Sequence, residues 1–310
     1  MKSISVKLKN KNTIIITDSG LGGLSVQALI VKKLMHYINN NLEIIFFNAL
    51  AEKNYGYNSL KSKKDKLLIF NNVLNGMLQF NPDVILIACN TLSTLYNETE
   101  ISKNISIPVI GIVESGTEMV LENIKKVKEF SIIILGTETT ISSNQHKSEL
   151  IRLGIDEKKI ITQPCKNLET EIQNNPRSKK VRELIKKYLH EAAIQIENKI
   201  VHQFVLFACT HYGYSKNIFS EELIKLYGKN FTILNPNEQM AGLINFKDNM
   251  NNLDNGNLNI RVLSKVKVSE SQKKNLGVLL SKDSLEVAAA LENYEYLPHL
   301  FKFNKLEINN

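Results

Sequence analysis

Two short blocks of the sequence each end an apolar run with a cysteine and further polar residues. The run VILIA at residues 84–88 is followed by Cys-Asn-Thr, and the run FVLFA at residues 204–208 is followed by Cys-Thr-His. An apolar run of this length, bounded by polar residues, is typical of a strand buried on both faces. Ligands of open α/β sheets bind beyond the carboxyl ends of such strands. The blocks therefore predict two thiols, Cys89 and Cys209, placed where chemistry could occur.

Each of these thiols needs a neighbouring group that can accept its proton and return it. The thiolate is the reactive form, and a free cysteine with a pKa of about 8.5 is only a few per cent ionised at neutral pH. Asp18 is the natural partner for Cys89, and His211 for Cys209. A structural interpretation stands beside this one, because a buried cysteine often packs as a small hydrophobe and Asp18-Ser19 could simply cap a helix. Cys165 lies outside both blocks and is interpreted as structural.

Several chemistries could use a cysteine in such a place. A metal site favours closely spaced ligands such as CxxC, and the sequence has none. A redox disulfide would leave the polar neighbours unexplained, and a single Cys–His nucleophile would use only one of the two blocks. Inversion of a carbon stereocentre uses both, since one thiolate removes a proton from one face and the opposite thiol returns a proton to the other.

An internal repeat relates the two blocks. The separation between Asp18 and Cys89 is almost the same as that between Thr137, which opens a second polar loop behind an apolar run, and Cys209. Strands alternate with helical segments of ten to twenty residues, a pattern typical of βαβ units and parallel sheets. The sequence therefore predicts an α/β fold of two pseudo-symmetric lobes, each a mostly parallel sheet flanked by helices, with the active site in the cleft between them.

The predicted elements follow the hydrophobic pattern. Strands are expected at 13–17, 43–48, 84–88, 109–113, 132–135, 159–162, 204–208, 232–234 and 260–268. Helices are expected at about 24–37 and 59–79, between the strands at 84–88 and 109–113, from 114, at 145–153, 179–199 and 215–227, after Pro236, and in the remainder beyond the last strand. Residues 165–176 are polar and without a clear pattern. The first lobe is predicted to comprise residues 13–112 and about 232–285, the second to comprise residues 113–231, and a C-terminal tail to comprise residues 286–310.

Composition narrows the function classes. The chain has 310 residues, of which 43% are hydrophobic and 23% are charged, as in an ordinary soluble globular protein. No run approaches the roughly 18 apolar residues of a membrane span, and the N-terminus has no apolar segment of a signal peptide. Three cysteines favour a reducing compartment, so we expect a cytoplasmic protein. The net charge of +8 comes from lysines scattered over predicted helices, which argues against a nucleic-acid partner.

Four ordered blocks of this sequence resemble a known family. TDSGLGGLSV, ACNT, GTETTISSN and ACTHY are similar, in order and spacing, to the signature blocks of glutamate racemase within the aspartate/glutamate racemase family. The resemblance covers about residues 13 to 270. It implies a cofactor-independent isomerase with no metal that interconverts L- and D-glutamate through two cysteines, supplies D-glutamate for peptidoglycan, and forms a homodimer.

Site residues carry over from the matching motifs. The resemblance implies four acid/base residues: Cys89, Cys209, Asp18 and His211. It implies that the substrate is held by Asp18, Ser19, Tyr55, Gly56, Asn90, Thr91, Thr137, Thr140, Thr210 and His211. Hydroxyls, amides and backbone N–H groups can bind a dianion without adding a competing base. His211 favours glutamate, because aspartate racemases of the family usually carry an acidic residue there; aspartate racemase is the alternative.

The sequence also departs from the family pattern. Asn48 stands where the family has an acidic residue, Asn54 where it has the proline before Tyr-Gly, Glu138 where it has a basic residue, and His146 where it has a tyrosine. Glu171 is a loose candidate for an acidic residue that the family places after its middle Cys-Pro segment. These changes motivate a second hypothesis, a catalytically silent binding protein with the same cleft.

Two further hypotheses have little support in the sequence. The glycines at 20, 22 and 23 lack the third glycine of the G-x-G-x-x-G fingerprint, and no acidic residue ends the second strand, which disfavours nucleotide binding. No lysine occupies a motif position suited to a Schiff base, which disfavours a pyridoxal enzyme.

Overall fold

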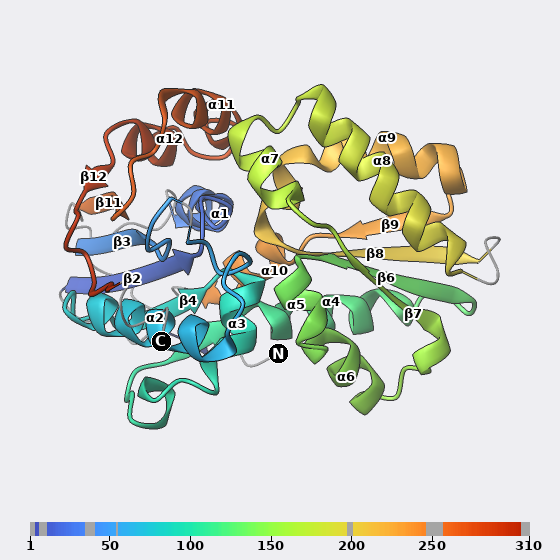
Figure 1. Ribbon diagram of the computed structural model, residues 1–310, viewed down its shortest axis with the longest axis horizontal. Helices are drawn as coiled ribbons and strands as arrows, with labels where there is room; N and C mark the ends of the chain where they lie inside the picture. Colours follow the sequence, from blue (N-terminus) through green and yellow to red (C-terminus); the bar gives the residue numbers. More distant parts are fainter. Residues whose placement is uncertain are drawn as a thin grey trace, which may run out of the picture.

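The computed structural model describes residues 4–5, 11–34, 41–53, 55–196, 201–245 and 257–304. It has two lobes, each built on one parallel sheet with helices on both faces (Figure 1). We call lobe 1 the lobe with the six-stranded sheet and lobe 2 the lobe with the four-stranded sheet. The two-lobe α/β fold expected from the sequence is confirmed.

The lobe 1 sheet has the strand order β12-β11-β3-β2-β4-β5, with every neighbouring pair parallel. Its strands are β2 (Lys11–Asp18), β3 (Asn41–Asn48), β4 (Val84–Ile87), β5 (Val109–Gly111), β11 (Leu258–Ser264) and β12 (Glu295–Tyr296). A separate short pair joins β1 (Ile4–Ser5) to β10 (Ile244–Asn245).

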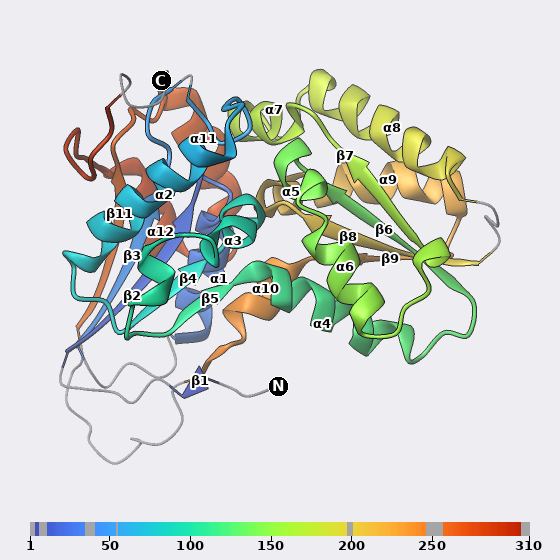
Figure 2. The same ribbon diagram turned by 60° about the horizontal axis from the view of Figure 1, so that its bottom comes forward.

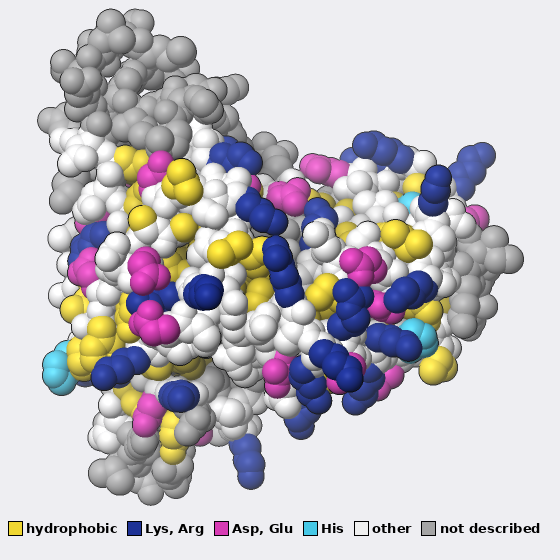
Figure 3. All heavy atoms as spheres, turned by 90° about the horizontal axis from the view of Figure 1, so that it is seen from above, with side chains coloured by type: hydrophobic (Ala, Val, Ile, Leu, Met, Phe, Trp, Pro, Cys, Tyr) yellow, Lys and Arg dark blue, Asp and Glu magenta, His cyan; other side chains and the backbone are white. Residues whose placement is uncertain are grey.

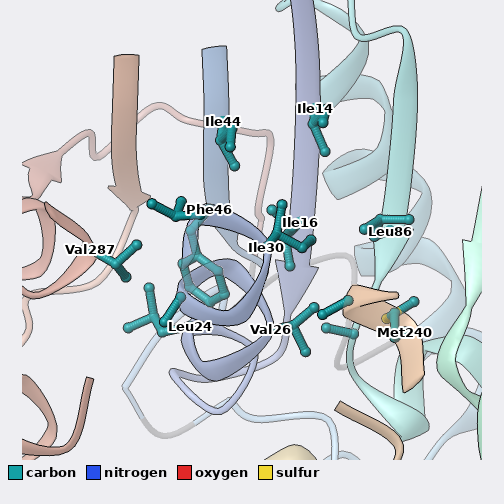
Figure 4. Close-up of a cluster of buried hydrophobic side chains, with 14 of the residues drawn as sticks. Ile14, Ile16, Leu24, Val26, Ile30, Ile44, Phe46, Leu86, Met240 and Val287 are labelled. Carbon is teal, nitrogen blue, oxygen red and sulfur yellow. The ribbon is translucent and has the colours of Figure 1, made fainter. Parts of the chain in front are cut away.

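Continuous apolar strands form this sheet because both of its faces are covered. In β2, the side chains of Ile14 and Ile16 lie in the cluster beneath α1 (Leu24–Leu34), whereas Ile15 lies in the cluster beneath α2 (Lys63–Leu78). Figure 4 shows the first cluster, in which Phe46 of β3 packs among Leu24 and other side chains of α1. Because successive side chains of a strand point to opposite faces of the sheet, one apolar run contributes to the hydrophobic core on each face.

Lobe 2 has the strand order β7-β6-β8-β9, again all parallel. Its strands are β6 (Phe130–Gly136), β7 (Ile160–Pro164), β8 (His202–Ala208) and β9 (Phe231–Leu234). One face packs on α7 (Leu168–Asn174), α8 (Lys179–Ile194) and α9 (Lys216–Tyr227). The other packs on α4 (Ile112–Ile124) and α6 (Gln145–Arg152).

Several α-helices begin at a residue whose side chain caps the first turn. Ser62, Ser178 and Ser284 each accept a hydrogen bond from a backbone N–H of the first turn, and Ser269 forms a full capping box with Gln272. The helices are α1 (Leu24–Leu34), α2 (Lys63–Leu78), α3 (Asn90–Tyr96), α4 (Ile112–Ile124), α5 (Glu138–Ser142), α6 (Gln145–Arg152), α7 (Leu168–Asn174), α8 (Lys179–Ile194), α9 (Lys216–Tyr227), α10 (Pro236–Ala241), α11 (Glu270–Leu280) and α12 (Leu285–Glu292). The 3₁₀ helices are η1 (Ile101–Lys103), η2 (Glu157–Lys159) and η3 (Thr210–Ser215).

The strand order places the two cysteines at equivalent points of the two sheets. In lobe 1, β2 is flanked by β3 on one side and β4 on the other, so the chain direction across the sheet reverses between β2 and β4. In lobe 2 the same reversal falls between β6 and β8. Such switch points open a crevice at the carboxyl ends of the strands. Asp18 and Cys89 lie at the first switch point, and Thr137 and Cys209 at the second.

The structure differs from the sequence expectations in three segments. Residues 168–174, in the stretch without a clear pattern, form α7. Beyond β11 the chain forms two helices and a strand rather than one helix and a polar tail, and α12 and β12 pack on β11. β9 pairs with β8, so the chain returns to lobe 1 after Leu234 rather than at about residue 232.

Charged side chains of both signs mix on the surface. On the face shown in Figure 3, Lys and Arg side chains are interspersed with Asp and Glu. Within lobe 2, Arg182 forms an ion pair with Glu221 at 2.6 Å. Within the part of the chain that the structure describes, no helix has the length and apolar character needed to span a bilayer.

Candidate active site

Cys89 lies between β4 and α3, directly beyond the carboxyl end of its strand. Its side chain is buried, and its Sγ lies 3.1 Å from Ser19 Oγ. Burial is the largest cause that raises the pKa of the Cys89 thiol, to about 12, and the charge of Asp18 adds to it. The hydrogen bond from Ser19 acts in the opposite direction without overcoming burial. Cys89 is therefore a protonated thiol at neutral pH in this arrangement.

Cys209 occupies the corresponding place in lobe 2, between β8 and η3. It is also buried, and its Sγ lies 3.8 Å from Nδ1 of His211. Burial again raises the pKa of the thiol most, followed by the negative charges of Glu169 and Asp18. A thiol with a raised pKa gives up its proton less readily, but its thiolate is a stronger base once formed.

Gln173 fixes the protonation of His211. Leu21 N–H donates to Gln173 Oε1 at 2.8 Å, which identifies that atom as an acceptor. The same oxygen lies 2.9 Å from His211 Nε2, so Nε2 must carry a proton. Burial lowers the pKa of His211, which keeps the ring neutral. Nδ1 is therefore free of a proton and faces the Cys209 thiol as an acceptor.

Asp18 reaches across the cleft to lobe 2. It is almost fully buried, and Thr210 Oγ1 donates to its Oδ2 at 2.6 Å. Asn237 Nδ2 in turn donates to the Thr210 carbonyl oxygen at 3.1 Å, and this hydrogen bond fixes the backbone of Thr210. The carboxylate of Asp18 in lobe 1 is thus held by Thr210, a residue of the ACTHY block in lobe 2.

Three threonine hydroxyls meet on the other side of the cleft. Thr91 Oγ1 lies 3.0 Å from the hydroxyl oxygens of both Thr137 and Thr140, which are themselves 3.0 Å apart. Thr91 belongs to lobe 1 and the other two to lobe 2. This cluster joins the lobes and presents hydroxyl groups that can donate to an anion.

The glycine loop after β2 allows the lobes to approach closely. A Cβ atom on Gly20 would lie 2.6 Å from Gln173 Oε1, and one on Gly22 would lie 2.6 Å from His211 Nδ1. Neither position can hold a side chain without moving His211 or its partner. The glycines therefore serve the close packing of this loop against lobe 2.

These residues line one cleft between the lobes. Its volume is about 1430 Å³, larger than the ~300–1,000 Å³ of most ligand pockets. The lining includes both cysteines and lysines near its rim, among them Lys53 and Lys265. No group of three or more His, Cys, Asp or Glu side chains within the described ranges is arranged to hold a metal ion.

Comparison with known proteins identifies the family. A family model described as Asp/Glu/Hydantoin racemase matches residues 32–227. The chain belongs to this racemase family.

Named relatives agree with this assignment. A glutamate racemase of Hydrogenobaculum sp. (strain Y04AAS1) is 30% identical over 232 residues, covering 74% of this chain and 79% of that protein. A glutamate racemase of Leptospira interrogans is 28% identical over 228 residues, covering 72% of this chain and 80% of that protein. The protein is an amino-acid racemase, and hence an isomerase.

Solved racemase structures share the fold. Glutamate racemase from Campylobacter jejuni has a TM-score of 0.63 at 19% identity, covering 87% of this chain and 98% of that chain. The structure from Francisella tularensis in complex with D-glutamate has a TM-score of 0.62 at 21% identity, covering 88% and 95% of the two chains.

The structure gathers most residues that the racemase resemblance singled out. The cleft lining contains Asp18, Ser19, Gly56, Cys89, Asn90, Thr91, Thr137, Cys209, Thr210 and His211. Thr140 lies behind this lining, in contact with Thr137. Tyr55 packs on the ring of Phe303, with centroids 5.9 Å apart, while the neighbouring Tyr57 lines the cleft.

The residues that depart from the family pattern have different surroundings. Asn48 donates to Ser264 Oγ and accepts from Leu50 N–H, so it fixes the end of β3. Glu138 lies at the cleft and pairs with Lys166 at 3.7 Å. Asn54 lies outside the described residues. His146 is buried against Asn90.

Sequence reasoning missed the cleft residues of α7, among them Glu169 and Gln173. Gln173 lies beside His211, whereas Glu171, the loose candidate for the family's acidic residue, is not part of the cleft lining. Glu169 lies four residues before Gln173 and accepts from Asn58 Nδ2 at 2.9 Å. The i, i+4 spacing puts both side chains on one face of a helix. This spacing would have predicted the two cleft residues only if residues 168–174 had been recognised as helical.

Proposed function

We propose that this protein interconverts L- and D-glutamate, with Cys89 and Cys209 as acid and base on opposite faces of the α-carbon and without a cofactor or metal. The observation that carries the proposal is the pair of buried thiols at equivalent switch points of two sheets that line one cleft. The glutamate racemases among its relatives support the choice of substrate.

The Cys209 side supplies the base. His211 Nδ1 takes the proton from Sγ of Cys209, which gives a thiolate and an imidazolium. The thiolate then removes the α-proton of the substrate, and the electron pair of the broken C–H bond passes into the α-carboxylate as an enolate-like charge. The raised pKa of Cys209 favours this step, because the α-proton is weakly acidic and requires a strong base.

The Cys89 side supplies the acid. Cys89 starts as a thiol and gives its proton to the opposite face of the α-carbon, which leaves a Cys89 thiolate, a protonated Cys209 and the His211 imidazolium. This end state is the starting state for the reverse reaction. Ser19, at 3.1 Å, can donate to the Cys89 thiolate, and proton exchange with solvent restores the first state.

Polar groups of the cleft are suited to bind the substrate. Asp18 carries a negative charge that complements the substrate ammonium. The hydroxyls of Thr91 and Thr137 and the amide of Asn90 can donate to carboxylate oxygens, whereas the Thr210 hydroxyl already donates to Asp18. We propose substrate contacts for Asp18, Ser19, Gly56, Asn90, Thr91, Thr137, Thr210 and His211. We propose a supporting role behind the lining for Tyr55 and Thr140, which pack on Phe303 and Thr137.

The cellular setting follows from the family resemblance. We propose that the protein acts in the cytoplasm as a homodimer and that its product, D-glutamate, is used for peptidoglycan.

Incubation of the purified protein with L-glutamate tests the proposal. We expect the optical activity to fall to zero as a racemic mixture forms, and Cys89→Ala and Cys209→Ala to lower the rate by at least about a thousandfold each, as for loss of a catalytic acid or base. Cys165→Ala is the matched control and retains the rate. Racemisation of aspartate alone would change the substrate, and no racemisation of either would overturn the proposal.

A further inference from the structure

His146 is a buried residue near the cleft that the mechanism above does not use. It lies on α6 in lobe 2 and is 3% exposed. Its Nε2 lies 3.1 Å from Oδ1 of Asn90, the first residue of α3 in lobe 1. The contact therefore joins the helix that follows the third sequence block to the residue beside Cys89.

The amide of Asn90 has one satisfied and one unsatisfied end. Its Oδ1 faces His146, whereas its Nδ2 is buried and has no hydrogen-bond partner among the described residues. Asn90 also lines the cleft. A buried donor left unpaired is unfavourable, so the Nδ2 group is suited to a ligand that enters the cleft.

The tautomer of His146 determines which end of the amide faces the cleft. Burial lowers the pKa of His146 to about 4, so the ring is neutral at pH 7 and carries one proton. With that proton on Nε2, His146 donates to Oδ1 and the two Nδ2 protons of Asn90 remain for the cleft. With the proton on Nδ1, Nε2 would accept, the amide would turn over, and a carbonyl oxygen would face the cleft instead.

We propose that His146 is a positioning residue, whose Nε2–H holds the Asn90 oxygen so that the Asn90 NH₂ group donates to a carboxylate of the substrate. The proposal rests on the proposed function for the identity of the substrate. An oxygen of Asn90 aimed at a carboxylate would place two acceptors together, whereas an NH₂ group supplies the donors that a dianion requires. His146 thus acts through Asn90 and does not itself touch the substrate.

A pair of substitutions separates this role from simple packing. In His146→Gln the side-chain amide nitrogen can take the place of Nε2, and in His146→Asn it can take only the place of Nδ1. Both side chains are polar and neutral. We expect His146→Asn to raise KM for glutamate roughly five- to tenfold with a smaller change in kcat, as for the loss of one hydrogen bond, and His146→Gln to restore most of that loss.

A double-mutant cycle tests whether the effect passes through Asn90. In an Asn90→Ala background, His146→Asn should change KM little further, because the group that it positions is gone. His202→Asn is the matched control: His202 bonds Thr232 at 2.9 Å within the lobe 2 sheet and is absent from the cleft lining. It should leave KM unchanged.

Nitrogen NMR of the unliganded wild-type protein gives a readout that is independent of activity. We expect the chemical shifts of His146 to show a protonated Nε2 and an unprotonated Nδ1. The Nδ1–H tautomer, equal KM values for His146→Asn and wild type, or additive effects of His146→Asn and Asn90→Ala would overturn the proposal. If the wild type does not racemise glutamate, the proposed function fails, and the tautomer alone decides the orientation of Asn90.

Discussion

Burial and hydrogen bonding set the protonation state of each cysteine and histidine side chain in the site. Both thiols have a raised pKa, so neither is ionised at rest, and the base must be generated within the site. His211 can generate it only while Nδ1 is free of a proton. Gln173 secures that state, because a neutral amide oxygen accepts from Nε2 without attracting a second proton to the ring.

Replacement of Gln173 by Glu should change the pH dependence of the reaction. A carboxylate beside Nε2 stabilises the imidazolium and raises the pKa of His211, so a higher pH is needed to keep Nδ1 free. We expect the acidic limb of the kcat/KM profile to move to higher pH by roughly one unit or more. Gln173→Met is a control without the charge. An unshifted acidic limb in Gln173→Glu would show that His211 is not the proton acceptor.

At the level of elements, the C-terminal segment belongs to the lobe 1 core. Leu300 and Phe301 are buried in the same cluster as Ile15 and Met77, and the Phe301 ring lies 6.0 Å from that of Phe47. β12 adds a strand beside β11. The segment also reaches the cleft, where Phe303 packs on Tyr55.

Loss of the Phe301 side chain should therefore destabilise the whole protein. Truncation of a buried Phe to Ala removes apolar contacts and leaves a cavity, which costs about 3–5 kcal/mol. We expect Phe301→Ala to lower the unfolding midpoint in denaturant with an unchanged slope. Lys302→Ala, at the exposed neighbouring position, should have no effect. Equal stability of the two variants would place residues 300–304 outside the folded core.

The elements that could be predicted from the sequence are those with a clear hydrophobic pattern, either an apolar run or a helical periodicity. The apolar runs before Cys89 and Cys209 predicted both strands and the positions of both thiols. α7 was missed because its seven residues bury only Leu168 and Ile172, too few for a helical pattern to stand out. The contacts of Gln173 and His146 were missed for another reason, since they join residues of different elements and depend on lobe packing.

At the scale of the whole molecule, α7 of lobe 2 forms hydrogen bonds with lobe 1 across the cleft. In Figures 1 and 2 it lies next to α11. Glu169 accepts from Asn58, Gln173 accepts from Leu21 N–H, and Gln272 and Asn275 of α11 donate to Asn174. The helix whose Gln173 contacts His211 is thus also the helix that connects the two lobes. The position of the proton acceptor His211 therefore depends on the contact between the lobes.

Glu169 should make stability depend on pH. Burial raises its pKa above the unfolded value, and its Oε2 has no hydrogen-bond partner among the described residues. The folded state therefore favours the protonated acid, and stability falls as pH rises from the unfolded pKa through the folded pKa. We expect Glu169→Gln to raise the thermal midpoint at pH 7 by about 2–4 °C, as for roughly 1 kcal/mol. The gain should vanish below about pH 4; a gain of equal size at both pH values would contradict this origin.

The central claim is that two cysteines act on opposite faces of one carbon, and the fate of hydrogen in D₂O tests it most directly. The reaction would be started with each protiated enantiomer of glutamate in turn and followed by NMR and chiral separation at early times. Two bases predict that the product carries deuterium at the α-carbon from its first appearance, while unreacted substrate remains protiated in both directions. Deuterium entering the recovered substrate as fast as the product would show that a single base serves both faces, and would contradict the account.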